Sequence, residues 1–251
     1  MTRKETLAEG VEVYLGDCLE VLPALMSIDM GAWRELPEAD RALPLLHHRD
    51  RAPLPFDAIL TDPPYGLGKK MQGGTWGAKD ESSGFLKWDL EAKQEWVDLI
   101  LAASVPTILW GGNYFNVPAA RCWLFWNKIN SVPTMADAEL AWTNLDRPAK
   151  RFDAPVGRVE FGHPTSKPLP LIEWCVGFLP SATCILDPFL GSGTSGVAAV
   201  KAGKRFIGIE IGEAYFDTAC RRIEAATKEP DLFIERASPL KQTSMFSDEA
   251  A

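Results

Sequence analysis

The sequence predicts an α/β fold, in which a mostly parallel, twisted sheet carries helices on both faces. Residues 183–226 have the pattern strand, glycine-rich turn, helix, strand and helix, and the two strands end on the acids Asp187 and Glu210. Residues 56–61 are a short apolar run of the kind found in buried strands. At 251 residues, the chain is long enough for one domain of this class with a well-buried core.

Hydrophobic periodicity indicates the remaining elements. Residues 11–15 alternate between apolar and polar and run into Gly16-Asp17, which is typical of a strand that ends in a turn. Residues 18–26 carry leucines at helical spacing, with Pro23 as an interruption. Further strands are expected at 107–110, 122–126 and 138–142, and further helices at 91–103 and 168–178.

We expect one domain over residues 1–226, followed by a partly disordered tail, 227–251, in which the periodicity is lost. Residues 27–55 are rich in Pro, Arg and Asp without a sustained period, and we expect an irregular insertion there. Residues 66–90 begin with a Gly- and Lys-rich stretch that is typical of a mobile loop.

Composition and charge exclude several classes of protein. The sequence has no apolar run of membrane-spanning length, and its first ten residues lack the apolar core of a signal peptide, so we expect a cytoplasmic protein without a membrane partner. Its five cysteines form no C-x-x-C pair, which argues against a metal site or a disulfide framework. The net charge of −8 does not by itself suggest nucleic acid, although a few well-placed basic residues can still form a basic face.

The glycine-rich turn at 187–194 reads Asp-Pro-Phe-Leu-Gly-Ser-Gly-Thr. Glycines between a strand and a helix let the backbone approach a ligand closely. Glu210, at the end of the next strand, has the spacing at which nucleoside-binding units hold ribose hydroxyls. A tight turn alone would explain the glycines, but together with Glu210 they favour a nucleoside site. Both a dinucleotide and S-adenosylmethionine fit this pattern.

The sequence Asp62-Pro63-Pro64-Tyr65 follows the buried strand at 56–61 directly. The exocyclic amine of a base is a poor nucleophile, because its lone pair is delocalised into the ring. The Asp62 carboxylate and the Pro63 carbonyl could accept both of its N–H groups and direct the lone pair at a methyl sulfonium, while Tyr65 offers a face for a flipped-out base. An acid-capped proline turn is the alternative, but this combination after a buried strand is much rarer.

These residues resemble the motifs of DNA amino-methyltransferases, which methylate adenine N6 or cytosine N4. Residues 62–65 are similar to their catalytic motif, 187–193 to their cofactor motif, and 163–168 (His-Pro-Thr-Ser-Lys-Pro) to the motif that precedes it. The catalytic motif comes first, which resembles the β group of these enzymes. The resemblance covers about residues 11–223 and implies a circularly permuted Rossmann-like methyltransferase fold.

The resemblance implies a site-specific, S-adenosylmethionine-dependent DNA methyltransferase of restriction-modification type that acts on N6 of a flipped-out adenine. Asp62 and the Pro63 carbonyl would orient the amine, Pro64 would shape the turn, and Tyr65 would stack on the base. His163 is expected to be structural and not a base. The residues implied around the cofactor are Asp17, Thr165, Ser166, Lys167, Asp187, Phe189, Gly191, Gly193, Thr194 and Glu210.

Double-stranded DNA is the partner that the resemblance implies. Relatives carry a long target-recognition segment, but here only residues 143–162 are available, little against the roughly 1,000–2,500 Å² that specific interfaces bury. We therefore expect short or relaxed specificity, or a homodimer whose two copies share the DNA. The residues expected to contact DNA are Lys69, Lys70, Arg147, Lys150, Arg151 and Arg158.

Other functions stay open to different degrees. Cytosine N4 methylation uses the same clamp, although relatives acting on N4 more often carry serine in place of Asp62. Cytosine C5 methylation is disfavoured, because no cysteine here follows a proline. Protein-glutamine methyltransferases carry asparagine in place of Asp62 and the opposite motif order. An inactive DNA-binding or regulatory homologue would still bind the cofactor, and an NAD-dependent protein would leave residues 62–65 unexplained.

Overall fold

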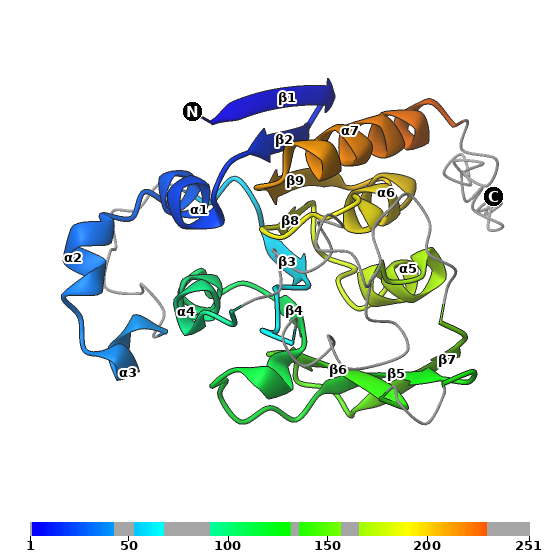
Figure 1. Ribbon diagram of the computed structural model, residues 1–251, viewed down its shortest axis with the longest axis horizontal. Coiled ribbons are helices and arrows are strands. Elements are labelled where there is room, and N and C mark those ends of the chain that lie inside the picture. The colour runs from blue at the N-terminus through cyan, green and yellow to red at the C-terminus, as the bar shows by residue number, and fades with distance from the viewer. Residues whose placement is uncertain (1, 43–52, 68–90, 132–135, 157–165, 230–251) are drawn as a thin grey trace, which may run out of the picture.

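The computed structural model describes residues 2–42, 53–67, 91–131, 136–156 and 166–229 (Figure 1). Within these residues, one sheet has the strand order β1-β2-β9-β8-β3-β4-β6-β5-β7. The strands are β1 (Arg3–Ala8), β2 (Val11–Leu15), β3 (Ala58–Thr61), β4 (Thr107–Trp110), β5 (Trp123–Lys128), β6 (Ala138–Thr143), β7 (Lys150–Ala154), β8 (Cys184–Asp187) and β9 (Arg205–Glu210).

Most neighbouring strands are parallel, as the sequence predicts. β2, β9, β8, β3 and β4 form a continuous parallel block, and β7 pairs with β5 in parallel. β1 lies antiparallel to β2, and β6 lies antiparallel to both β4 and β5. All residues of β3, β4 and β8 are buried, as expected for central strands that are covered on both faces.

Helices cover the two faces of the sheet (Figure 1). On one face, a buried apolar cluster joins alternate strand residues such as Leu60 and Trp110 to α5 (Leu169–Val176), α6 (Thr194–Lys201) and α7 (Glu213–Lys228). On the other, the intervening strand residues join α1 (Cys18–Met26) and α4 (Gln94–Ala102). The strand period of two residues thus divides the core into two halves.

The chain order places a topological switch point between β8 and β3. From β8, the chain passes through α6 to β9 on one side, whereas from β3 it passes through α4 to β4 on the other. The helices that follow the two strands lie on opposite faces of the sheet. In open α/β sheets, ligands bind in the crevice beyond the carboxyl ends of strands at this point. Asp62 and Asp187 lie at these two ends.

Five elements lie outside the sequence prediction, and one of them is a 3-10 helix, η3 (Gly112–Tyr114). The segment 27–55, expected to be irregular, contains two short helices, α2 (Met30–Arg34) and α3 (Glu38–Arg41). Each is too short to show a helical period, and a polar cap, Asp29, starts α2. The strands β1 and β7 also lack an apolar pattern, because they form the two edges of the sheet and most of their residues are exposed or half-buried. Among the described residues, no helix is long and apolar enough to cross a membrane.

Candidate active site

The turn after β3 brings Asp62 and Tyr65 together. β3 ends at Thr61, and Pro63 and Pro64 turn the chain away from the sheet. The Tyr65 hydroxyl donates a hydrogen bond to Oδ1 of Asp62. Burial, followed by the negative charges of Asp62 and Glu139, raises the pKa of Tyr65 well above its usual value. The phenol is therefore neutral at physiological pH and acts as a hydrogen-bond donor.

Lys167 pairs with the second carboxylate oxygen of Asp62. Its Nζ donates to Oδ2 of Asp62 and lies 3.3 Å from the Tyr65 hydroxyl. Burial lowers the pKa of Lys167, but the carboxylates of Asp62 and Glu139 raise it more, so the net shift is upward and the side chain is an ammonium. The resemblance implies a place for Lys167 at the cofactor, whereas in the structure its charge pairs with Asp62 in the turn after β3.

Two residues of this site, Glu139 and Lys128, have no counterpart in the sequence prediction. Glu139 Oε2 of β6 lies 3.2 Å from Lys167 Nζ, and Oε1 pairs with Lys128 of β5. Burial raises the pKa of Glu139, but the two lysines lower it more, so this carboxyl is ionised. Both residues lie within predicted strands or beside them, where the sequence gives no sign that they face the turn after β3.

An aromatic pair forms the outer wall of the turn. The rings of Tyr65 and Tyr114 stack with their centroids 4.8 Å apart. Gly111, at φ +67°, allows this arrangement, because a Cβ at this position would overlap Cε1 of the Tyr65 ring. Tyr114, in a short 3-10 helix at Gly112–Tyr114, stays 44% exposed and presents its ring to solvent beside Tyr65.

Replacing Gly111 with alanine is expected to displace the Tyr65 ring and to lower the free energy of unfolding by about 1–3 kcal/mol more than the strain of a positive φ alone. Gly203 supplies a matched control. Its φ is +68°, but no atom lies within 4 Å of the position that a Cβ would take there, so Gly203→Ala carries the backbone strain without the clash. Urea denaturation of both variants measures the difference. Equal losses would show that Tyr65 does not lie against Gly111.

Asp187 links the glycine turn to the turn after β3. Thr61, the residue before Asp62, donates its hydroxyl to Oδ1 of Asp187 at 2.7 Å. The backbone N–H of Phe189 donates to the same oxygen at 3.0 Å, and Ser195 of α6 donates to the other. Burial raises the pKa of Asp187 to about 6, against the opposing effect of these bonds. The carboxyl thus fastens β8, β3 and α6 to one another.

Glu210 closes the glycine turn from the next strand. Its carboxylate accepts the backbone N–H of Gly191 at 2.7 Å and that of Gly212 at 2.8 Å. Burial raises the pKa of Glu210 to about 7, although these two bonds oppose the shift. Ile211 directly follows and is 69% exposed, so an apolar surface lies beside the carboxylate at the carboxyl end of β9. Gly193, at φ +86°, ends the turn against Ala219 of α7, with no room for a side chain.

A polar cluster ties the residue before Lys167 to the start of α6. The hydroxyls of Ser166 and Ser192 lie 2.6 Å apart. Arg222 of α7 donates to the hydroxyl of Ser192 at 2.9 Å and to that of Thr194 at 3.3 Å. The resemblance implies Ser166 and Thr194 at the cofactor, whereas Arg222, in the last predicted helix, has no place in the sequence prediction of the site.

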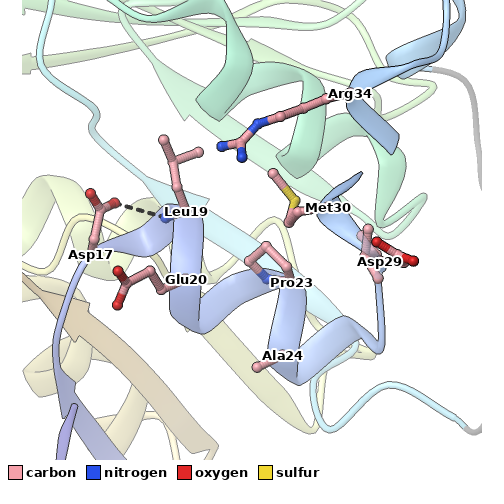
Figure 2. Close-up of a pocket in the computed structure, with 9 residues that line it drawn as sticks. Asp17, Leu19, Glu20, Pro23, Ala24, Asp29, Met30 and Arg34 are labelled. Carbon is pink, nitrogen blue, oxygen red and sulfur yellow. Dashed lines mark hydrogen bonds between the residues drawn. The ribbon is translucent and has the colours of Figure 1, made fainter. Parts of the chain in front are cut away.

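Asp17 lies at the end of β2, beside the end of β9, and caps α1 by accepting the N–H of Leu19 at 2.8 Å. It also borders a groove of about 670 Å³ between α1 and α2 (Figure 2). In Figure 2, the carboxylates of Asp17 and Glu20 lie on one side of α1, and the Arg34 side chain extends toward Leu19 from α2. The groove contains no part of the turn after β3, so we assign the candidate site to the carboxyl ends of β3, β8 and β9.

The residues expected to contact DNA are only partly described. Arg147 lies over the ring of Phe178, while Lys150 and Arg151 lie on the edge strand β7, where Arg151 pairs with Asp153. All three basic residues are exposed, but none lies in the network around Asp62. The predicted residues outside the described part of the chain are Lys69, Lys70, Arg158, His163 and Thr165. The described residues include no cluster of three potential metal ligands.

Part of the chain is similar to a known protein family. A DNA methylase family model matches residues 125–221, which begin within β5, end within α7 and include Lys167, the glycine turn and Glu210. These residues are similar to the DNA methylase family, and we call them the DNA methylase region. The DNA methylase region does not include the turn at residues 62–65, which precedes it in the chain.

The similarity to individual relatives extends beyond the DNA methylase region. The Type II methyltransferase M2.DpnII of Streptococcus pneumoniae is 34% identical over 123 residues, 49% of this chain and 43% of that protein. The chain thus spans less than half of that relative. The Type II methyltransferase M.ScaI of Streptomyces caespitosus is 26% identical over 229 residues, 68% of this chain and 75% of that one. A solved structure, the M1.HpyAVI–SAM complex, is 21% identical and covers 84% of this chain and 98% of its own, with a TM-score of 0.48.

Proposed function

We propose that this protein is an S-adenosylmethionine-dependent DNA methyltransferase that methylates N6 of adenine. The observation that carries the proposal is the hydrogen bond from Thr61 to Asp187, which fastens the Asp62 turn to the glycine turn at the switch point of the sheet. A base amine held at Asp62 would therefore lie beside a ligand held by the glycine turn. The relatives, which are methyltransferases by name, support the same reaction class.

The residues at the ends of β8 and β9 fit S-adenosylmethionine. The Glu210 carboxylate has lone pairs beyond the two bonds it accepts and can hold ribose hydroxyls. Exposed Ile211 offers an apolar surface for the purine, and Phe189 follows Asp187 in the turn. Asp17, Ser166, Gly191, Gly193 and Thr194 complete the proposed site, with Thr165 beyond the described residues. The cofactor supplies a methyl group on a positively charged sulfur.

The catalytic work of the chain is positioning. Asp62 and the Pro63 carbonyl accept the two N–H groups of the amine, which directs its lone pair away from the ring. The negative Asp62 also stabilises the positive charge that grows on the nitrogen. The amine proton leaves to water, and no covalent intermediate with the protein forms. Tyr65, whose ring stacks on that of Tyr114, provides the aromatic face on which the flipped base stacks.

The choice of adenine rests on Asp62, because the related cytosine N4 enzymes more often carry serine there. We place the DNA over the exposed basic residues Arg147, Lys150 and Arg151, with Lys69, Lys70 and Arg158 as further contacts, and treat residues 1–226 as the catalytic domain. Two copies that share one duplex would compensate for the short recognition segment. We propose a cytoplasmic location, where double-stranded DNA is available.

The test is transfer of a tritiated methyl group from S-adenosylmethionine to DNA that carries no methylated bases, followed by separation of the nucleosides. Label in N6-methyladenine is the expected result. Label in N4-methylcytosine would preserve the mechanism and overturn the choice of base. Cofactor binding without any label in DNA would contradict the proposed reaction and favour a regulatory homologue.

Cofactor affinity is expected to fall below neutral pH. The pKa of Glu210 is raised to about 7, so lowering the pH protonates this carboxyl and removes an acceptor for the ribose hydroxyls. If only the ionised form binds, the Kd for S-adenosylmethionine is about tenfold weaker at pH 6 than at pH 8. Isothermal titration calorimetry at both pH values measures it. Glu210→Gln should remove most of the dependence on pH and leave only the part that comes from Asp187, whose pKa is raised to about 6. The same Kd for the wild type at both values would contradict the assignment.

A further inference from the structure

Each of the two oxygens of the Asp62 carboxylate accepts a hydrogen bond in this structure. Lys167 donates to Oδ2, and the Tyr65 hydroxyl donates to Oδ1. An amine that uses Asp62 as its acceptor competes with these two donors. The lysine is the stronger competitor, because its bond to Asp62 is between two charges. A second carboxylate that draws Lys167 away from Asp62 and pairs with the ammonium would therefore favour the reaction.

Glu139 is placed to act as this second carboxylate. Its Oε2 lies 3.2 Å from Lys167 Nζ, so the ammonium lies between two carboxylates. The centroid of the Trp110 ring lies 5.0 Å from the same nitrogen and that of the Tyr65 ring 5.7 Å, so two aromatic rings lie beside the ammonium. The Lys167 side chain is only 5% exposed, so water offers it little alternative solvation. Movement away from Asp62 thus leads toward Glu139.

Lys128 fixes Glu139 from the other side. It pairs with Oε1 of Glu139, and its side chain is 8% exposed. The four side chains therefore alternate in charge from the edge of the site to the reacting centre, in the order Lys128, Glu139, Lys167, Asp62. β5 and β6 are hydrogen-bonded neighbours, so Lys128 and Glu139 are held by the sheet and not by a loop.

We propose that Glu139, held by Lys128, is a positioning residue that takes over the Lys167 ammonium and so frees Asp62 to accept the substrate amine. This inference rests on the proposed function for its kinetic consequence. Without the charge of Glu139, the ammonium stays on Asp62, and the amine gains no acceptor there. Glu139 contacts the Lys167 ammonium, so its proposed effect on the substrate amine acts through Lys167.

The first test compares the kinetics of Glu139→Gln with the wild type. We expect kcat and kcat/KM for DNA to fall together by about 10- to 100-fold, with an unchanged Kd for S-adenosylmethionine. The Tm should fall, because the buried Lys128 and Lys167 ammonium groups lose a charged partner, so both enzymes are assayed at a temperature at which they are folded. Glu139→Asp, which keeps the charge, should recover part of the activity. Glu12→Gln is the matched control, because Glu12 is also a half-buried strand residue paired with a lysine, Lys4, away from the site. A Glu139→Gln enzyme with wild-type kcat would overturn the inference.

A second readout does not depend on turnover. The Nζ signal of Lys167 in a ¹⁵N-lysine NMR spectrum can be assigned from its loss in Lys167→Arg and followed with pH. Glu139→Gln should lower the pKa of Lys167, because one of its two anionic partners is removed, whereas Glu12→Gln should not. An unchanged pKa would overturn the inference even if the protein does not methylate DNA. A lowered pKa in a protein without activity would preserve the contact and reject the proposed function.

Discussion

Asp62→Asn is expected to slow methyl transfer by roughly a thousandfold while leaving the affinity for S-adenosylmethionine within about twofold of the wild type. The substitution keeps the size of the side chain but removes the negative charge that pairs with Lys167 and stabilises the reacting amine. The cofactor residues at the ends of β8 and β9 are unaffected by the substitution. Single-turnover kinetics and calorimetry measure the two quantities separately.

Asp57→Asn is the matched control for Asp62→Asn. Asp57 precedes the same strand at its opposite end, where its carboxylate accepts the backbone N–H groups of Thr183 and Cys184. Its loss is expected to reduce stability by about 1 kcal/mol without affecting the rate of methyl transfer. A rate for Asp62→Asn close to that of Asp57→Asn would show that Asp62 does not contact the reacting base.

Lys167→Met is expected to have the largest effect on stability, a loss on the order of 3 kcal/mol at pH 8. The substitution leaves Asp62 and Glu139 facing each other without the cation between them. Their repulsion raises the folded-state pKa of one carboxyl above its unfolded value. The folded state then binds a proton more readily, so the loss should become smaller as the pH falls through that pKa.

Urea denaturation of Lys167→Met and the wild type at pH 8 and pH 5 measures this prediction. Lys201→Met supplies a control, because Lys201 forms only an exposed pair with Glu173, and such pairs contribute about 1 kcal/mol or less. If Lys167→Met lost no more stability than Lys201→Met at pH 8, the buried charge network would have no energetic role.

The sequence predicts the central part of the fold well. The strands around Asp62, Asp187 and Glu210 are short, apolar and bounded by turns, and such runs have few alternatives to a buried parallel strand. The helix at 18–26 is confirmed although it contains Pro23, because Asp17 caps its start and the proline lies in a helix whose apolar face is buried. The edge strands β1 and β7 lack this apolar signal, since their pairing depends on backbone bonds to a neighbour.

Only part of the candidate site can be predicted from the sequence. Asp62, Tyr65, Asp187 and Glu210 stand out because each directly follows or ends a predicted strand. Glu139 does not, because the side on which a strand residue lies depends on register, and no local pattern relates β6 to the turn after β3. Long-range contacts of this kind, like that between Arg222 and Ser192, arise from tertiary packing.

The most direct measurement is nucleoside mass spectrometry of DNA from bacteria that lack other DNA methyltransferases and express either the wild-type protein or Asp62→Asn. We predict N6-methyladenine in the DNA of cells with the wild-type protein and none above background with Asp62→Asn, at equal levels of folded protein. N6-methyladenine at the same level in both would contradict the role of Asp62. DNA without any methylated base in cells with folded wild-type protein would contradict the proposed reaction itself.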